Sequence, residues 1–242
     1  MSFFDFFHKN SSETAPEAVD HTSRQRLVEV VLGILRDESG RIAIEDAISA
    51  AATIVGERCI DAAGDYSLRD HDRIPGSGQF STKVNDLICG DVLNDINQIP
   101  RDSVIGILRD RLDMEVYTNE DFPNLSQVFK NYADRAGNPA NWGKVPLSVP
   151  EGNLPAILPL RFGFETRPYV DEILYPIRED RSRCLRVATE SLAEILMRVA
   201  SGIDRRLALT LAIETMNGMS KIAPMTVKAM QEIQQNVDRP AE

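Results

Sequence analysis

The sequence predicts an all-α protein of about eight or nine helices. Apolar residues recur at three- and four-residue steps along most of the chain, which is the spacing of one helix face. Glycine or proline stands at the ends of most of these stretches, as is typical of helix termini. Of the 242 residues, 43% are apolar and 26% are charged, a composition that allows a sizeable core.

The N-terminal part of the fold, residues 21–137, contains several such stretches. They predict helices at about residues 22–39, 44–63, 80–89, 101–112 and 123–136. The second of these is rich in alanine, which permits close packing against a neighbouring helix. Residues 1–20 are expected to form a flexible tip, and residues 65–79 a long loop of the kind that is often functional or disordered.

Proline changes the pattern in the middle of the chain. Seven of the thirteen prolines fall between Pro139 and Pro176. Because proline removes an amide donor and clashes with the preceding helical turn, residues 138–176 are predicted to be irregular. The segment is also rich in apolar residues, so we expect it to pack across the helices as extended chain, with a short strand pair as one possible arrangement. This packing favours one domain over residues 21–242.

The C-terminal part, residues 177–242, returns to helix. One helix is predicted up to Gly202, a second from about Asp204 to Asn217, and a third from about Pro224. The second is apolar around most of its circumference, which indicates a helix that is either central or in an interface.

Composition excludes several classes of function. A formal net charge of −10 disfavours nucleic-acid binding, because an acidic surface repels phosphate. No stretch approaches the ~18 apolar residues of a spanning helix, so no integral membrane association is expected. Cys59, Cys89 and Cys184 are predicted to be buried free thiols. The chain shows no secretory signal pattern, and a cytoplasmic location is expected.

The sharpest enzymatic motif is Asp70-His71-Asp72 in the predicted loop. Adjacent histidine and aspartate can share a divalent metal ion when further ligands arrive from neighbouring helices. The His71-Asp72 dyad resembles the signature of the helical HD phosphohydrolases, a resemblance that implies metal-assisted hydrolysis of phosphate esters. Asp70 and His21 are the candidate additional ligands. The alternative is a solvated loop in which neighbouring arginines pair with the acids.

Arginines gather at the predicted start of the long C-terminal helix. The candidate patch for an anion or acidic partner comprises Arg178, Arg181, Arg183 and Arg186, extended by Arg205 and Arg206 if the two helices are antiparallel. Cations are unfavourable at the positive end of a helix dipole, so something should offset them. The alternative is a solvated face, or one paired internally with acids such as Glu179 and Asp180.

Aromatic residues provide candidate docking sites for a partner. Phe3, Phe4, Phe6 and Phe7 form a cluster too short for a stable helix, which we expect to pack on this chain or on a second copy. Trp142 could anchor an interface or attach the Pro-rich segment to the core.

Two hypotheses of function follow. The first is a non-catalytic interaction or scaffolding module that self-associates through its last helices, because helix 204–217 is apolar on several sides and no convincing catalytic constellation is found. The second is a metal-dependent phosphohydrolase that uses the His-Asp dyad. We favour the first, for which no cofactor is expected.

Overall fold

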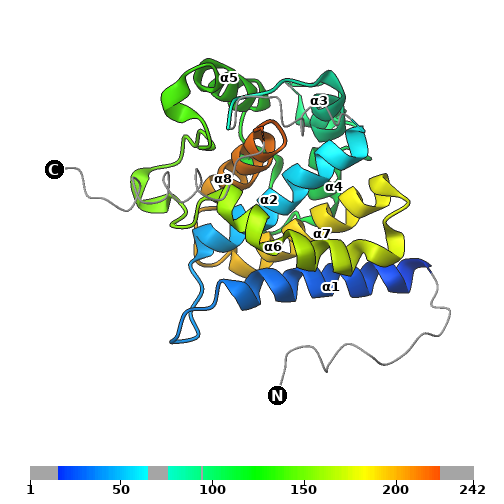
Figure 1. Ribbon diagram of the computed structural model, residues 1–242. Coiled ribbons are helices and arrows are strands. Elements are labelled where there is room, and N and C mark those ends of the chain that lie inside the picture. Colours follow the sequence, from blue (N-terminus) through cyan, green and yellow to red (C-terminus); the bar gives the residue numbers. More distant parts are fainter. Residues whose placement is uncertain (1–15, 65–75, 94, 224–242) are drawn as a thin grey trace.

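The computed structural model describes residues 16–64, 76–93 and 95–223, and these residues form eight α-helices and no strand (Figure 1). The predicted all-α class is therefore confirmed. Strand-like pairing among these residues is limited to an isolated antiparallel bridge between Gly78 and Ile222. The short strand pair considered for residues 138–176 accordingly does not form there.

The first two helices illustrate how the sequence sets helix ends. Helix α1 (Pro16–Ile34) begins well before the predicted start at residue 22. Proline is favoured at the first helical position, where its missing amide has no partner to lose. Helix α2 (Ile44–Ala63) has the predicted bounds, and it ends at Gly64, whose φ of 62° is left-handed.

Helix α2 is the central helix of the fold. It packs against α7 (Arg181–Val199), α8 (Arg205–Met219) and α6 (Pro159–Leu174), and every residue from Asp46 to Ile60 is buried. Small side chains make this possible. A Cβ atom added at Gly56 would lie 2.6 Å from a backbone carbonyl oxygen of α8.

The sequence left open whether the apolar helix that is now α8 is central or lies in an interface. Its residues from Leu211 to Met219 are all buried, and the helix packs against α2 and α5 (Leu125–Ala136). It is therefore central within this chain. The apolar sides of α8, from which self-association through this helix was predicted, are covered by other helices of the same chain.

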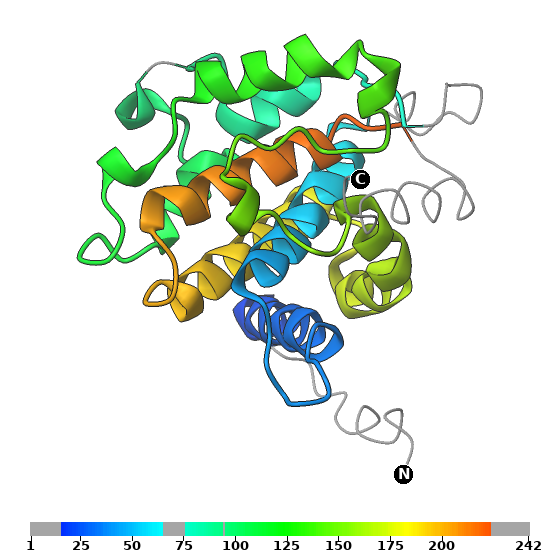
Figure 2. The same cartoon turned by 90° about the vertical axis from the view of Figure 1, so that its left-hand side faces the viewer.

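The remaining helices form an outer layer. Helices α1 and α4 (Val104–Arg111) pack against α7, while α3 (Thr82–Cys89) packs against α2 and α4. Polar side chains at the N-cap positions accept backbone amides and define where most of the later helices begin; they are Ser81, Ser103, Asn124, Asp180 and Asp204. The two views in Figures 1 and 2 show α1 and α5 on opposite sides of the central helices.

The Pro-rich segment differs from the prediction in its second half, because α6 occupies residues 159–174 of the range expected to be irregular. Pro159 stands at the start of this helix, where proline is tolerated. Pro168 lies inside it on the exposed side, where the carbonyl that loses its amide partner can meet water. Only residues 138–158 are irregular, with short 3₁₀ turns at Pro139–Asn141 and Glu151–Asn153.

Residues 138–158 connect α5 to α6 and run beside α8 and α2 (Figure 2). Two buried carboxylates hold this segment: Asp46 accepts the backbone amide of Ile157 at 3.0 Å, and Glu214 accepts that of Ser148 at 2.6 Å. Burial raises the pKa of Asp46, and the amide hydrogen bonds oppose the rise. The segment is thus tied to the two central helices.

Among the described residues no helix has both the length and the apolar character needed to cross a bilayer.

Candidate protein-binding face

One side of α6 is buried and the opposite side exposes aromatic rings. The helix packs against α2 and α1, and Phe162, Val170 and Ile173 are buried. On the opposite side Phe164 is 49% exposed and Tyr175 is 62% exposed. Aromatic residues are enriched in protein interfaces relative to the rest of the surface.

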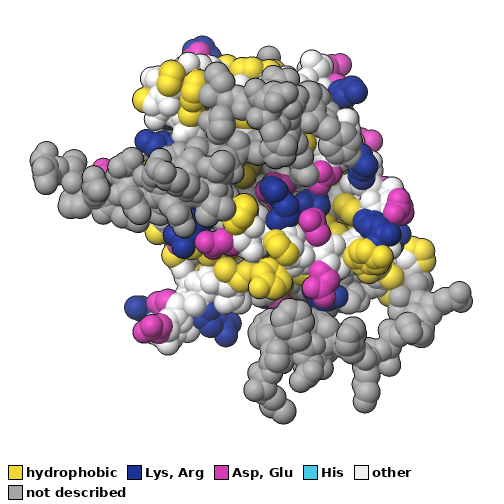
Figure 3. Space-filling model, in the orientation of Figure 1, with side chains coloured by type: hydrophobic (Ala, Val, Ile, Leu, Met, Phe, Trp, Pro, Cys, Tyr) yellow, Lys and Arg dark blue, Asp and Glu magenta, His cyan; other side chains and the backbone are white. Residues whose placement is uncertain are grey.

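These rings follow one stripe of the helix. Pro168 lies four residues after Phe164, and Tyr175 lies eleven residues after it, about three helical turns. Tyr175 opens a 3₁₀ turn, Tyr175–Ile177, which continues α6 directly. Along α6 in Figure 3, hydrophobic side chains alternate with basic and acidic ones.

Arg178 extends this stripe by a stacking contact. Its guanidinium carbon lies 3.7 Å from the centroid of the Tyr175 ring, and its Nε atom lies 3.1 Å from Glu179 Oε1. A cation over an aromatic ring is attracted to the ring face, so the contact restrains an exposed side chain. Phe164, Pro168, Tyr175 and Arg178 are called the α6 face below.

Ion pairs hold α6 firmly on α2. Arg167 of α6 binds Glu57 of α2 at 2.5 Å, and Arg58 of α2 binds Asp171 of α6 at 2.9 Å. The Glu57 side chain is only 7% exposed, so it needs this partner. Gly163 permits the approach, because a Cβ atom there would lie 2.8 Å from Glu57 Oε1. The residues of the α6 face therefore belong to a helix that is held in place against α2.

The arginines predicted as an anion patch at the start of α7 mostly bind groups of this chain. Arg183 donates to Asp20 at 2.7 Å and to the Pro16 carbonyl oxygen at 2.7 Å. Arg181 donates to the Asp61 carbonyl oxygen at 3.5 Å. Arg186 is exposed.

The structure does not bring Arg205 and Arg206 to that cluster. They open α8, which follows the far end of α7 after a short connection. A helix of 19 residues spans about 28 Å, so the two arginine groups lie at opposite ends of α7. When two consecutive helices are antiparallel, the second begins near the end of the first. An antiparallel arrangement therefore separates the two arginine groups, and the prediction of one joint patch was wrong on this point.

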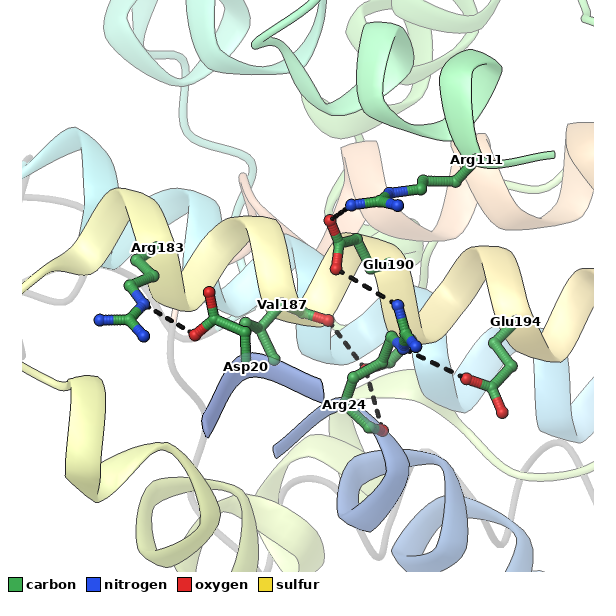
Figure 4. A network of polar contacts seen from close by, with 8 residues as sticks. Asp20, Arg24, Arg111, Arg183, Val187, Glu190 and Glu194 are labelled. Carbon is green, nitrogen blue, oxygen red and sulfur yellow. Dashed lines mark hydrogen bonds and ion pairs between the residues drawn. The ribbon is translucent and has the colours of Figure 1, made fainter. Parts of the chain in front are cut away.

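A second polar network joins α1 to α7 and α4 (Figure 4). Arg24 of α1 lies 3.7 Å from Glu190 and 3.4 Å from Glu194, both on α7. Arg111 of α4 reaches the other oxygen of Glu190 at 2.5 Å. Glu190 is nearly buried, and its two arginines neutralise it. The network therefore holds three helices together.

Most of the candidate metal ligands, Asp70, His71 and Asp72, lie outside the described residues. His21 is described, and it is exposed on α1. Among the described residues no group of three histidine, cysteine, aspartate or glutamate side chains is placed to hold a metal ion. The metal-site hypothesis remains a prediction.

The candidate docking residues Phe3, Phe4, Phe6 and Phe7 also lie outside the described residues. Trp142 is half-buried and lines a hollow of about 10 Å³ together with Tyr132 and Ile222. Its ring therefore lies against its own chain.

Sequence reasoning missed Lys221, the most unusual ionisable group of the described structure. Lys221 is 2% exposed, and it donates to Asn217 Oδ1 with its ammonium 4.2 Å from the centroid of the Phe129 ring. Burial lowers the pKa of this amine to about 7. Burial also raises the pKa of the nearby thiols, Cys59 to about 12 and Cys89 to about 11. The position of Lys221 directly after an apolar helix is the one sequence signal that could have indicated its burial.

The three cysteines are free and buried, as predicted. Comparison with known proteins assigns no family to the chain: no protein-family model, curated protein or solved structure matches it.

Proposed function

We propose that this protein is a non-catalytic interaction module that self-associates through the α6 face. The observation that supports the proposal is the exposed stripe of Phe164, Pro168 and Tyr175 on a helix that is fixed to the core on its other side. This differs from the expectation of contact through the last helices, because α8 is covered within the chain.

The charge of this region is compatible with a second copy of the chain as the partner. From residue 159 to residue 179 there are three arginines and four acidic residues, a net of 3 − 4 = −1. Two copies that meet here therefore bring together little net charge, so electrostatic repulsion between them is weak.

The order of the charges also suits a symmetric dimer. In a two-fold symmetric dimer the same surface of both copies forms the contact. Each copy must therefore supply both the basic and the acidic residue of any ion pair across the contact. Arg161 and Glu165 alternate along the exposed side of α6, 2.9 Å apart within one chain. Such residues can exchange partners across a two-fold axis while the aromatic rings fill the centre of the contact.

Light scattering over a range of protein concentrations tests the proposal. We expect wild type to associate and the double variant Phe164→Ser, Tyr175→Ser to need at least about tenfold more protein for the same association, a change of about 1.4 kcal/mol. The matched control is Met114→Ser, since Met114 is 50% exposed in the loop after α4. A wild type that stays monomeric, or a double variant that associates like wild type, contradicts the proposal.

A further inference from the structure

A pocket of about 480 Å³ opens at the start of α8, away from the α6 face. Its walls are the first turn of α8, the 3₁₀ turn Asn119–Asp121 with the start of α5, and the region of the 3₁₀ turn Ile96–Gln98. Small-molecule sites in proteins usually measure ~300 to ~1,000 Å³. The pocket is therefore large enough for a compact organic molecule.

The lining of the pocket is divided between apolar and polar groups. Leu93, Ile96, Phe122 and Leu125 supply apolar surface. Phe122 and Leu125 are almost fully buried, at 6% and 3% exposure, and Leu93 is 37% exposed. This combination suits a ligand with an aliphatic or aromatic side chain, which loses contact with water on these surfaces.

The polar groups of the pocket have unused bonding capacity. Within the described residues the side chains of Arg206 and Glu120 form no hydrogen bond or ion pair. Asn119 donates from Nδ2 to Asn97 at 2.9 Å, but its Oδ1 atom is buried without a hydrogen-bond donor. Because that oxygen is covered by protein atoms, the charged groups that a ligand in the pocket can reach are those of Arg206 and Glu120.

These groups suit a ligand that carries one negatively charged group and one positively charged group. Arg206 can bind a carboxylate, since its guanidinium presents paired donors. The Glu120 carboxylate can accept from an ammonium group. We infer that this pocket binds a small apolar α-amino acid, whose carboxylate faces Arg206, whose amine faces Glu120, and whose side chain lies on Ile96 and Phe122.

Calorimetric titration of the full-length protein with L-leucine and with L-phenylalanine tests the inference. We expect saturable binding by at least one of them below ~10 mM, and a loss of tenfold or more in affinity for Arg206→Ala. The matched control is Arg205→Ala, since Arg205 is also exposed in the first turn of α8 but does not line the pocket. Both substitutions are at exposed positions, so both variants should keep the unliganded melting temperature.

Two derivatives of the ligand test the assigned contacts separately. N-acetyl-L-leucine lacks the ammonium group and L-leucinamide lacks the carboxylate, and each should bind at least tenfold more weakly than L-leucine. The inference is overturned if neither amino acid binds, if Arg206→Ala binds like wild type, or if both derivatives bind as tightly as the amino acid. Self-association through the α6 face is measured separately, and neither result decides the other.

Discussion

Glu214 accepts two hydrogen bonds from Ser148, one from its backbone amide at 2.6 Å and one from its hydroxyl at 2.7 Å. The carboxylate belongs to α8 and is 3% exposed, while Ser148 lies in the irregular segment between α5 and α6. A buried helix therefore supplies the acceptor that an irregular chain needs for its backbone.

Replacement of Glu214 should loosen this segment. Glu214→Ala leaves the Ser148 amide and hydroxyl without their acceptor, and we expect it to lower the free energy of unfolding by about 3 kcal/mol. Urea unfolding measures the change. The matched control is Glu165→Ala, since Glu165 is exposed and pairs with Arg161 on the surface of α6, where a loss of about 0.5 kcal/mol or less is expected. Equal losses in the two variants contradict the role assigned to Glu214.

The contact between α6 and α2 depends on the absence of a side chain at Gly163. A methyl group there would lie 2.8 Å from Glu57 Oε1 and 3.1 Å from Thr53 Cγ2. We expect Gly163→Ala to lower the free energy of unfolding by about 2 kcal/mol, because the buried Glu57–Arg167 pair must shift. Gly33→Ala is the control within α1, where a methyl group meets nothing within 4 Å and should add about 0.5 kcal/mol. Thermal unfolding of both variants compares the two effects, and a gain of stability for Gly163→Ala is inconsistent with this packing.

Lys221 should make the stability of the protein depend on pH. Its pKa is lowered from 10.5 to about 7, so between these values the unfolded chain holds a proton that the folded chain has lost. Stability therefore rises with pH from 7, by about 1.4 kcal/mol per unit. Near pH 9 the trend should reverse, because Cys59 and Cys89 have raised pKa values and ionise first in the unfolded chain.

Lys221→Met separates the contribution of the amine from that of the thiols. Urea unfolding at pH 7 and pH 9 should show the rise in wild type, and the variant should lack it while it keeps the fall above pH 9. The same rise in both proteins would assign it to another group.

The sequence predicted most helices because their apolar residues face a common core. Helix α2 has its predicted bounds, since the alanine-rich stripe and Gly64 are local signals. Helix α6 was missed because proline was taken to end a helix, whereas Pro159 starts one and Pro168 faces solvent within it.

The candidate sites were less predictable than the helices. Whether Phe164 is exposed depends on which side of α6 the central helices cover, and Lys221 is buried by Phe129 of another helix. Both relations depend on contacts between helices that are far apart in the sequence, which the spacing of neighbouring residues does not predict. The same holds for Arg206, which a prediction by charge alone placed with the arginines at the other end of α7.

Hydroxyl-radical footprinting read by mass spectrometry tests self-association through the α6 face most directly, because it measures the exposure of individual side chains. Samples at ~1 µM and ~100 µM protein should differ at Phe164 and Tyr175, whose oxidation slows severalfold as copies associate, while Met114 and Phe80 react at the same rate. Unchanged oxidation of Phe164 and Tyr175 in a sample that light scattering shows to be associated, or protection confined to other surfaces, contradicts the account.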